Sequence, residues 1–355
     1  MLKLSIALLC VVTACVGCQR DAASPATAAT PAVTIMTFNV QNLFDTYDDP
    51  GKDDKAYLPI AAKQSAAHIA ECNMIEVASW REECLTQDWN ESILEHKLKV
   101  LADAIRQVDG GPDIIVFQEV EKAALLDRLS TEFLADFAYG PAILLEGQDQ
   151  RGIDSGFLSR LPLIGEARLH PSRFPEFADR EGDTRGILEA TFELPDGSSL
   201  TGFAVHFPAP FHPVAMREAA YRQLASLRQA LPDEQHAFAA GDFNTVSTEV
   251  ESTGILDRLA RPYWQIAHEL GCEGCKGSYY YAPDDNWSYL DMIFWSPARG
   301  ENATWKISAD SLRVLHQTEA QRTADGTPAR FSPGDRSGVS DHWPLAITIE
   351  PIEKQ

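Results

Sequence analysis

The sequence Ala239-Ala240-Gly241-Asp242-Phe243-Asn244-Thr245 places a carboxylate and a carboxamide directly after a short apolar run. The run His236–Ala240 predicts a buried strand, and Gly241 allows the backbone to turn at its end. Side chains two residues apart in an extended chain lie on the same side, so Asp242 and Asn244 are expected to face one pocket. A carboxylate beside a carboxamide suits a water that attacks a phosphoryl group. The same residue types are common in plain turns, so this stretch alone leaves both interpretations open.

Polar residues recur at or beside the ends of other predicted strands. These strands cover Val33–Asn39, Asp113–Val120, Ser155–Arg160, Gly186–Leu194, Leu200–Phe207, Tyr289–Trp295 and Trp343–Ile349, and helices are expected at Glu91–Val108, Ala123–Phe133 and Val214–Gln229. Strands that alternate with helices and hairpins predict an α/β fold with two packed sheets and helices outside. The strand-end set is Asn39, Glu119, His206, Asp242, Asn244, Asp291, Asp341 and His342. Each member has a structural explanation on its own, but the complete set indicates an active site.

Composition limits the classes of function. The chain has 355 residues, of which 45% are hydrophobic, so it is long enough for a large core. Its formal net charge of −22 argues against a broad nucleic-acid-binding surface, because phosphate contacts need Lys and Arg. A local cationic or metal-lined cleft remains compatible with that charge.

The N-terminus predicts export. Lys3 precedes the apolar run Leu4–Val16, which is too short to span a bilayer. Small residues precede Cys15 and Cys18, as in the bacterial lipobox, and Cys18 is favoured because Cys15 would leave a short signal. We expect a signal peptide at 1–17, a flexible tether at 18–32 and one domain at 33–351. An ordinary secretory signal is the alternative. Either way the domain is expected outside the cytoplasm, and lipidation at Cys18 would tether it to a membrane.

Four cysteines lie beyond the predicted signal. An even number in an exported chain suggests two disulfides, and short spacing favours Cys72 with Cys84 and Cys272 with Cys275. The second pair has the C-x-x-C spacing of redox and zinc sites, but no second such pair completes a zinc site. Residues 52–90 show no clear period and are interpreted as a surface insertion tied by the first pair.

Four motifs in order carry a family resemblance. Thr37-Phe38-Asn39-Val40, Gln118-Glu119-Val120, Gly241-Asp242-Phe243-Asn244 and Ser340-Asp341-His342 together resemble the endonuclease/exonuclease/phosphatase superfamily, which has the DNase-I-like fold. The resemblance covers about Val33–Pro351. It implies a four-layer α/β/β/α fold, a two-sheet sandwich flanked by helices. It also implies hydrolysis of phosphoester bonds that depends on a divalent cation, Mg²⁺ or Mn²⁺.

The resemblance also implies catalytic roles. Asp242 matches the aspartate that orients or deprotonates the attacking water, and Asn244 matches the asparagine that holds the phosphate. His342 matches the histidine that stabilises phosphoryl charge, and Asp291 matches the aspartate that orients it. We therefore expect a direct hydrogen bond between Asp291 and His342, and His206 matches a further active-site histidine.

Metal and substrate ligands follow from the same resemblance. Glu119 matches the metal-binding glutamate, with Asn39 beside the metal and Asp341 as an additional carboxylate on the metal side. Two substrate-binding matches are looser. Asp154 stands where many members have a tyrosine or similar polar group, and Arg185 fits a phosphate-contacting arginine.

Three functions remain open from the sequence. The leading one is a monomeric phosphodiesterase, with an extracellular nuclease as its most specific form. The alternatives are a lipid-headgroup or small-molecule phosphoesterase and a non-catalytic surface-binding lipoprotein on the same fold. The joint presence of the strand-end residues argues against the last, since a binding module needs no such set. The segment from His206 to His212 lacks the more basic residues of nucleases, so the substrate stays open.

Overall fold

The structure is a computed structural model that describes residues 30–272 and 274–353. The predicted signal peptide, Cys18 and most of the 18–32 tether lie outside the described residues. Within those two ranges, no helix combines the length and the apolar character that crossing a membrane requires.

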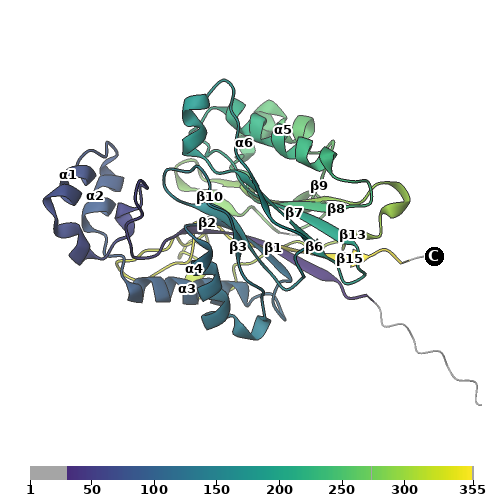
Figure 1. The fold of residues 1–355 in the computed structure, drawn as a ribbon, viewed down its shortest axis with the longest axis horizontal. Helices are drawn as coiled ribbons and strands as arrows, with labels where there is room; N and C mark the ends of the chain where they lie inside the picture. The colour runs from purple at the N-terminus through teal and green to yellow at the C-terminus, as the bar shows by residue number, and fades with distance from the viewer. Residues whose placement is uncertain (1–29, 273, 354–355) are drawn as a thin grey trace, which may run out of the picture. The chain divides into compact units, whose positions relative to one another are not determined.

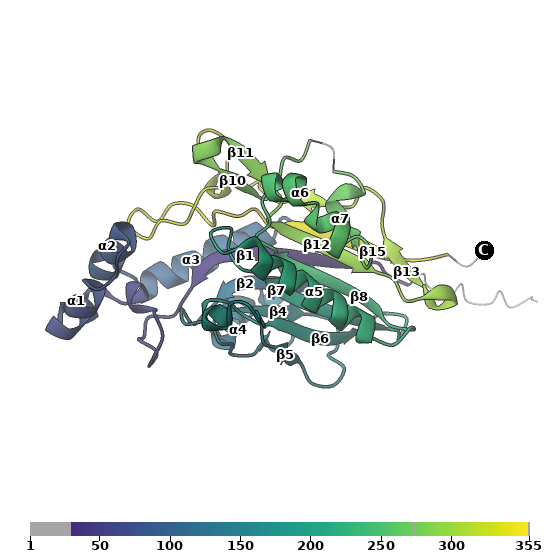
Figure 2. The same cartoon turned by 90° about the horizontal axis from the view of Figure 1, so that it is seen from above.

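Two large β-sheets form the middle of the domain (Figures 1 and 2). Sheet A contains β1 Val33–Leu43, β2 Ile114–Val120, β3 Ile143–Leu144, β4 Asp154–Ser159, β13 Trp305–Ile307, β14 Arg313–Val314 and β15 Leu345–Pro351. Its order is β13-β15-β1-β2-β4-β3, and β14 also pairs with β15. Sheet B contains β5 Arg168–His170, β6 Ile187–Glu193, β7 Ser199–His206, β8 His236–Asp242, β9 Gln265–Ile266 and β12 Asp291–Ser296. Its order is β5-β6-β7-β8-β12-β9. A short ribbon pairs β10 Tyr279–Tyr281 with β11 Asn286–Ser288.

Helices cover the outer faces of both sheets, except α1 and α2, which lie apart in the insertion (Figure 1). The helices are α1 Ala66–Cys72, α2 Ala78–Thr86, α3 Glu91–Ile105, α4 Ala123–Arg128, α5 Val214–Ala230, α6 Ser247–Thr253 and α7 Ile255–Leu259. In Figure 1, α3 and α4 lie on one side of the sheets and α5 and α6 on the other. Buried apolar residues form three layers: between sheet A and α3 with α4, between the sheets, and between sheet B and α5 with α7. The predicted four-layer α/β/β/α sandwich is therefore confirmed.

The central strands are apolar on both faces because each face has its own layer. In β1, Met36 packs toward α3, whereas Ile35 packs between the two sheets. In β2, Phe117 packs in the layer with α3 and α4, whereas Val116 packs between the two sheets. Successive side chains of a strand point to opposite faces, so a strand covered on both sides must be apolar throughout.

Helix α3 also positions the chain before the last strand. Its N-cap Asn90 accepts hydrogen bonds from the backbone N–H groups of Ser92 and Ile93, which stabilises a helix by about 1 kcal/mol. Inside α3, the fully buried Lys97 donates from Nζ to the backbone oxygen of Val339 at 2.8 Å. This bond holds the segment that leads into Ser340-Asp341-His342.

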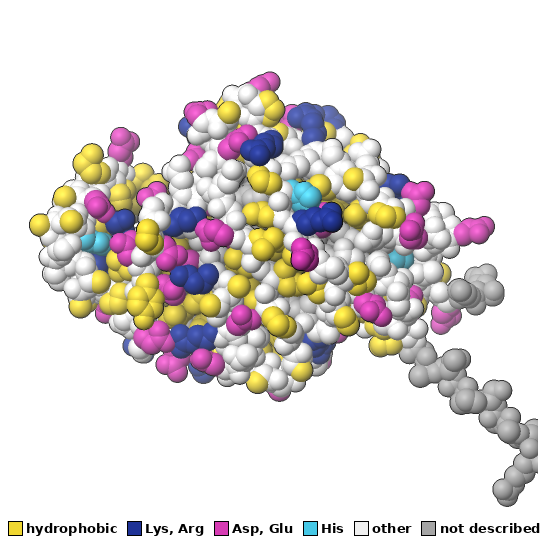
Figure 3. Space-filling view, viewed as in Figure 1, with side chains coloured by type: hydrophobic (Ala, Val, Ile, Leu, Met, Phe, Trp, Pro, Cys, Tyr) yellow, Lys and Arg dark blue, Asp and Glu magenta, His cyan; other side chains and the backbone are white. Residues whose placement is uncertain are grey.

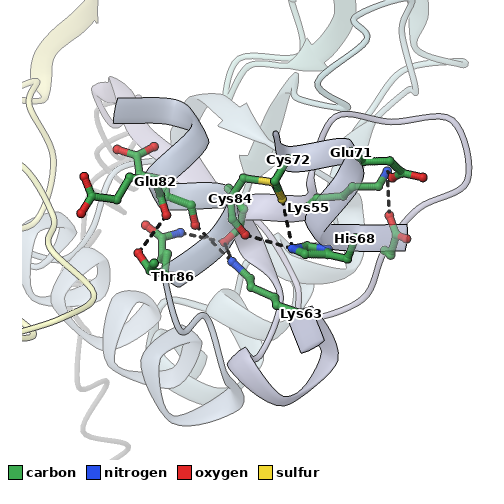
Figure 4. The surroundings of a disulfide bond; sticks show 12 residues. Lys55, Lys63, His68, Glu71, Cys72, Glu82, Cys84 and Thr86 are labelled. Atoms are coloured by element: carbon green, nitrogen blue, oxygen red, sulfur yellow. Dashed lines mark hydrogen bonds and ion pairs between the residues drawn. A yellow bond between two sulfur atoms is a disulfide. The ribbon is translucent and has the colours of Figure 1, made fainter. Parts of the chain in front are cut away.

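The insertion at 52–90 has more structure than its sequence indicates. It contains α1 and α2, and the disulfide Cys72–Cys84 joins them (Figure 4). Beside the disulfide, the buried Lys63 donates from Nζ to the backbone oxygens of Ala56 at 2.8 Å and Glu83 at 3.2 Å. Among their residues, α1 buries His68 and Cys72 and α2 buries Cys84, so neither helix has an apolar stripe that the sequence could show. The disulfide Cys272–Cys275 is also present, so both predicted pairs are confirmed.

Most element boundaries differ from expectation by one to three residues, and the two largest differences lie in β1 and α4. Strand β1 continues to Leu43, where a loop was expected from Gln41, and its pairing with β2 shifts register after Asn39. Gln41 and Asn42 adopt left-handed backbone conformations with φ of 53° and 57°. A bulge of this kind lets a strand continue while it re-aims side chains. In the second case, α4 ends at Arg128, and the expected helix goes on to Phe133 only as a wider π-helical turn.

Candidate active site

The predicted site lies where the layer between the sheets reaches one end of the central strands. His206 of β7 and Asp291 of β12 are the direct cross-strand partners of Asp242 in β8. The alternate residues Ala240 and Ile293 on those strands belong to the inter-sheet core. Because strand side chains repeat every second residue, this polar row continues the inter-sheet face of sheet B. Sheet topology therefore gathers residues that lie far apart in sequence.

Gly241 has a different role from the expected one. Strand β8 does not turn there but continues to Asp242. A Cβ atom at Gly241 would lie 1.9 Å from the backbone oxygen of Val205, and its φ is 148°. Glycine is needed because β7 approaches too closely for any side chain.

Asn39 joins the two sheets at the centre of the site. Its Nδ2 donates to Asp242 Oδ2 at 3.0 Å and lies 3.3 Å from Glu119 Oε1. Asn39 Oδ1 accepts from the backbone N–H of Gln41 at 3.0 Å, which fixes the orientation of the amide. One carboxamide thus holds the predicted metal ligand and the predicted base next to each other.

Glu119 reaches the site through a bulge in β2. Its φ is 65°, and the pairing of β2 with β4 shifts register between Phe117 and Val120. A left-handed conformation is costly for a residue other than glycine and is typical of functional positions. Burial opposes the charge of the carboxylate, but Arg151, Arg185 and His342 hold the pKa of Glu119 below its ordinary value. Glu119 is therefore charged at neutral pH, as a metal ligand must be.

Asp242 is buried and connected on both sides. It accepts from the backbone N–H of Asn244 at Oδ1, at 2.8 Å, and from Asn39 at Oδ2. Burial raises the pKa of Asp242 to about 7, although the nearby His342 charge acts in the opposite direction. A carboxylate with such a pKa can exchange a proton with water near neutral pH.

The expected common orientation of Asp242 and Asn244 was argued from an extended chain, and that argument was wrong. The strand ends at Asp242, and Asn244 has a φ of 51°. Its Nδ2 donates to the backbone oxygen of Phe207 at 2.9 Å, while its backbone supports Asp242. The two residues are neighbours in the site because of this tight turn.

The predicted hydrogen bond between His342 and Asp291 is confirmed. His342 Nδ1 lies 2.7 Å from Asp291 Oδ2, and Ser278 Oγ accepts from the backbone N–H of Asp291 at 3.0 Å. Burial opposes the imidazolium, but Asp291, followed by Asp242 and Asp341, raises the pKa of His342 to about 10. The ring is thus a cation at neutral pH, and its other nitrogen, Nε2, lies 3.9 Å from Asp242 Oδ2.

His206 completes the inner cluster. Its Nε2 lies 3.6 Å from Asp242 Oδ2 and 4.0 Å from Glu119 Oε1. Burial, together with the charges of Arg185 and Arg151, holds the pKa of His206 well below its ordinary value. The site therefore contains a charged imidazole, His342, and a neutral one, His206. The first can donate a hydrogen bond to negative charge that develops on the substrate, and the second can donate one to a bound water.

The remaining three predicted residues lie at the edge of this cluster. Arg185 is buried with Nε 3.2 Å from Asp149 Oδ2, and its charge acts on Glu119 and His206. Asp341 pairs with Arg330 at 3.2 Å, and Asp154 accepts from the backbone N–H of Gly147 at 3.0 Å. Within the described residues, neither Asp341 nor Asp154 has a hydrogen bond or ion pair to the inner cluster.

Sequence reasoning missed Arg151 and Asn42. The backbone N–H of Asn42 donates to Glu119 Oε2 at 2.9 Å, and Arg151 Nη2 donates to Asn42 Oδ1 at 2.5 Å. The Arg151 charge also lowers the pKa of Glu119. Neither residue follows a predicted strand or belongs to a motif, so no sequence signal identifies them.

The donor set fits a hard divalent cation. Glu119 offers a charged carboxylate and Asp242 adds carboxylate oxygens nearby, while the Asn39 amide turns its Nδ2 toward both and accepts at Oδ1 from the Gln41 N–H. Mg²⁺ in proteins typically binds one or two carboxylates and keeps several waters. The inner cluster, with the charged carboxylate of Glu119 near the carboxylate of Asp242, matches that preference.

A groove of about 810 Å³ adjoins the site. Its lining includes Asn42 of β1. Glu82 and Glu83 of the insertion and Arg330 and Arg336 of the loop before His342 also line it. Figure 3 shows acidic and basic side chains interspersed on one face of the protein instead of a single basic patch. Arg330 and Arg336 of the groove are therefore isolated cations on a chain whose net charge is negative.

Known proteins resemble the chain in sequence pattern and in fold. The profile of the Endonuclease/Exonuclease/phosphatase family matches residues 36–342. A humanized D. rerio TDP2 with 14 mutations has 14% sequence identity and a TM-score of 0.56, over 90% of this chain and 99% of that chain. The endonuclease/exonuclease/phosphatase from Beutenbergia cavernae has 16% identity and a TM-score of 0.54, over 90% and 72%. A family protein from Bacteroides thetaiotaomicron has 14% identity and a TM-score of 0.55, over 92% and 99%. No curated protein sequence gives a significant match.

Proposed function

The chain belongs to the endonuclease/exonuclease/phosphatase family, whose members hydrolyse phosphoester bonds, and we propose that it is a divalent-metal-dependent phosphodiesterase. The observation that carries the proposal is the setting of Asp242. This buried carboxylate, whose pKa is about 7, lies between Asn39 of sheet A and the charged ring of His342. A base and a cation that face one space suit an attack of water on a phosphoryl group.

Asp242 orients and deprotonates the attacking water in this proposal. The backbone N–H of Asn244 and the amide of Asn39 fix the two oxygens of its carboxylate. A positioned general base typically contributes about 10²–10⁴ in rate. His206 lies 3.6 Å from the same carboxylate and is available to hold the water beside it.

His342 stabilises the negative charge that develops on the phosphoryl oxygens. Its Nδ1–H donates to Asp291, which leaves the N–H at Nε2 for the substrate. Donors aimed at developing charge are each worth about 10²–10³ in rate. Asn244 and Arg185 are proposed to assist in holding the phosphate, and Asp341 to support the metal side of the site.

Glu119 would hold Mg²⁺ or Mn²⁺, with Asn39 beside the ion. When bound, such an ion polarises phosphoryl oxygens and stabilises the leaving oxygen. Members of the family typically use divalent metals.

The proposed substrate is a phosphodiester in a nucleic acid strand. Support comes from the groove beside Asn42, where Arg336 and Arg330, which is paired with Asp341, are the two cations that a phosphate backbone would meet. The acidic residues Glu82, Glu83 and Asp88 belong to the same lining. One similar structure, D. rerio TDP2 with a TM-score of 0.54, is described as a complex with a single-strand DNA product. Few cations line the groove, so we expect binding of a short single-stranded segment.

Hydrolysis of a substrate panel tests the proposal. The panel contains single-stranded DNA, plasmid DNA, RNA, bis(p-nitrophenyl) phosphate, a phosphomonoester and sphingomyelin, each with Mg²⁺, with Mn²⁺ and with EDTA. We expect turnover of single-stranded DNA that EDTA abolishes, and Asp242→Asn serves as the inactive control. Preference for sphingomyelin would replace the nucleic acid by a lipid headgroup. Absence of any turnover would favour a non-catalytic binding protein.

Export and membrane attachment form a separate part of the proposal. The apolar N-terminal run and the two disulfides favour a place outside the cytoplasm, and Gly17-Cys18 favours a lipoprotein. Labelling with a radioactive fatty acid should mark the wild type and not Cys18→Ser. Label that persists in Cys18→Ser would contradict the assignment.

A further inference from the structure

A second group of carboxylates lies outside the active site, between the loop after β1 and the end of β2. Asp49, Asp54 and Glu121 each contribute a side-chain oxygen, and these oxygens all lie within 4.8 Å of one another. Two segments of the chain meet here. The backbone N–H of Glu121, directly after β2, donates to the backbone oxygen of Leu43, the last residue of β1, at 3.0 Å. The proposed mechanism uses none of these three residues.

Two of these carboxylates are buried and only half satisfied. Asp54 is 1% exposed and Glu121 is 3% exposed. Asp54 Oδ2 accepts from the backbone N–H of Asp49 at 2.8 Å, and Glu121 Oε2 accepts from the backbone N–H of Asp45 at 2.7 Å. Asp54 Oδ1 is buried without a hydrogen-bond donor, and Glu121 Oε1 also accepts no hydrogen bond, although Lys122 Nζ lies 3.4 Å from it. A buried oxygen without a partner is costly, and one-sided anchoring by backbone N–H groups is how metal ligands are held.

The lysines nearby do not neutralise the group. Lys122 Nζ lies 2.7 Å from Asp45 Oδ2, 3.3 Å from Asp49 Oδ2 and 3.4 Å from Glu121 Oε1. No lysine contacts Asp54 within the described ion pairs. Burial raises the pKa of Asp54 to about 6, with the Asp48 charge acting in the same direction. Three carboxylates thus share one close ammonium group and Asp54 adds a fourth carboxylate without one, so the surplus of charge is negative.

We propose that Asp49, Asp54 and Glu121 bind a calcium ion that ties the loop after β1 to the end of β2. The donors are all hard oxygens, which excludes the thiolate and imidazole sets preferred by zinc. Ca²⁺ accepts six to eight oxygens at about 2.3–2.6 Å in adaptable geometry, whereas Mg²⁺ tends to keep its waters. Three carboxylates, two of them on an irregular loop, with Asp49 open to solvent for further water ligands, suit Ca²⁺ better.

The other cluster of possible ligands does not compete. His68, Cys72 and Cys84 also lie close together, but the two cysteines form a disulfide and offer no thiolate. The proposed calcium site is also separate in function from Glu119, whose carboxylate is held by Asn39 and Asn42. It would brace the two segments that carry Asn42 and Glu119.

The test separates this site from the catalytic metal. Full-length protein carrying Glu119→Gln removes the catalytic carboxylate, and isothermal titration with Ca²⁺ then counts the remaining sites. We expect one Ca²⁺ per chain in Glu119→Gln. Adding Asp54→Asn and Glu121→Gln should weaken binding at least 100-fold, whereas adding Asp53→Asn, an exposed acid in the same loop, should leave it unchanged.

A thermal shift provides the second measurement. Saturating Ca²⁺ should raise the melting temperature of Glu119→Gln by about 3–6 °C, and circular dichroism in EDTA should show all variants folded. The proposal is overturned if Glu119→Gln binds no Ca²⁺, which would mean that Lys122 alone balances the group. It is also overturned if the triple variant binds as the parent does, or if Mg²⁺ binds and Ca²⁺ does not.

Discussion

The active-site end of the sheets and the insertion at 52–90 are held together in opposite ways. In the site, Asn39 reaches Asp242 across 203 positions of sequence and Glu119 across 80. In the insertion, the disulfide closes a separation of 12, and Lys63 donates to backbone oxygens 7 and 20 positions away. The difference shows that sheet pairing positions the chemistry, whereas local links maintain the wall of the groove. Changes in the site should therefore affect rate, and changes in the insertion should affect stability.

Asp242→Asn should give the largest effect. The variant keeps the shape of the side chain but removes the base, so kcat should fall by about 10³-fold or more. The free energy of unfolding should stay near that of the wild type, because a buried carboxylate with a raised pKa contributes little favourable charge. Steady-state kinetics and urea denaturation provide the two measurements. A large loss of stability with retained rate would remove Asp242 from the catalytic set.

The Asp291–His342 pair should behave as one unit. Each single change to Ala should lower kcat by about 10²-fold, because the ring needs both its charge and its orientation. The double variant should be little worse than His342→Ala alone. A double-mutant cycle on kcat measures the coupling. Additive losses would show that the hydrogen bond is not used in turnover.

The same pair predicts a pH dependence of stability. Because the pKa of His342 is raised from 6.5 to about 10, its stabilising contribution is complete below pH 6.5. The contribution is lost as pH rises through about 10. In EDTA, the difference in unfolding free energy between wild type and His342→Gln should therefore shrink from pH 6 to pH 10. Urea denaturation at both pH values measures it, and a constant difference would contradict the assignment of the cation to His342.

Removing the disulfide of the insertion should change stability more than chemistry. Cys72→Ser with Cys84→Ser opens a loop of sequence separation 12, which costs roughly 3 kcal/mol in the chain-entropy model. The matched change, Cys272→Ser with Cys275→Ser, opens a separation of 3 and should cost about half as much. Turnover of bis(p-nitrophenyl) phosphate should persist in both. Thermal melts rank the two losses, and an equal or reversed order would contradict the local role given to the first disulfide.

The smallest effect concerns the backbone at Glu119. Both Glu119→Ala and Glu119→Gly remove the metal ligand, and in an ordinary strand glycine is the less stable choice. At a φ of 65° the order should reverse, with Glu119→Gly more stable by about 1 kcal/mol. Urea denaturation of the two inactive variants tests this. Greater stability of Glu119→Ala would show that the bulge relaxes when the side chain is removed.

Much of the fold was predictable because each layer of the structure produces its own pattern of apolar residues in the sequence. The leucines of α3 and the continuous apolar run of β2 indicate a helix on one face of a sheet that is buried on both faces. The site residues were predictable where they lie at a strand terminus, as Asp242 does at the end of β8 and Asp291 at the start of β12. The sequence could not show the bulge at Glu119, the turn of Asn244 or the approach of Arg151. These depend on backbone torsions and on loops that are positioned only by the finished sheets.

The left-handed backbone at Glu119 also has a consequence for the history of such genes. A glutamate codon becomes a glycine codon by a single change of the middle base, GAA to GGA or GAG to GGG. While catalysis is under selection, the strained glutamate must be kept. Once selection ceases, that one mutation removes the metal ligand and relaxes the backbone together. We therefore expect glycine at this position to mark duplicated copies of the gene that have lost activity and kept the fold.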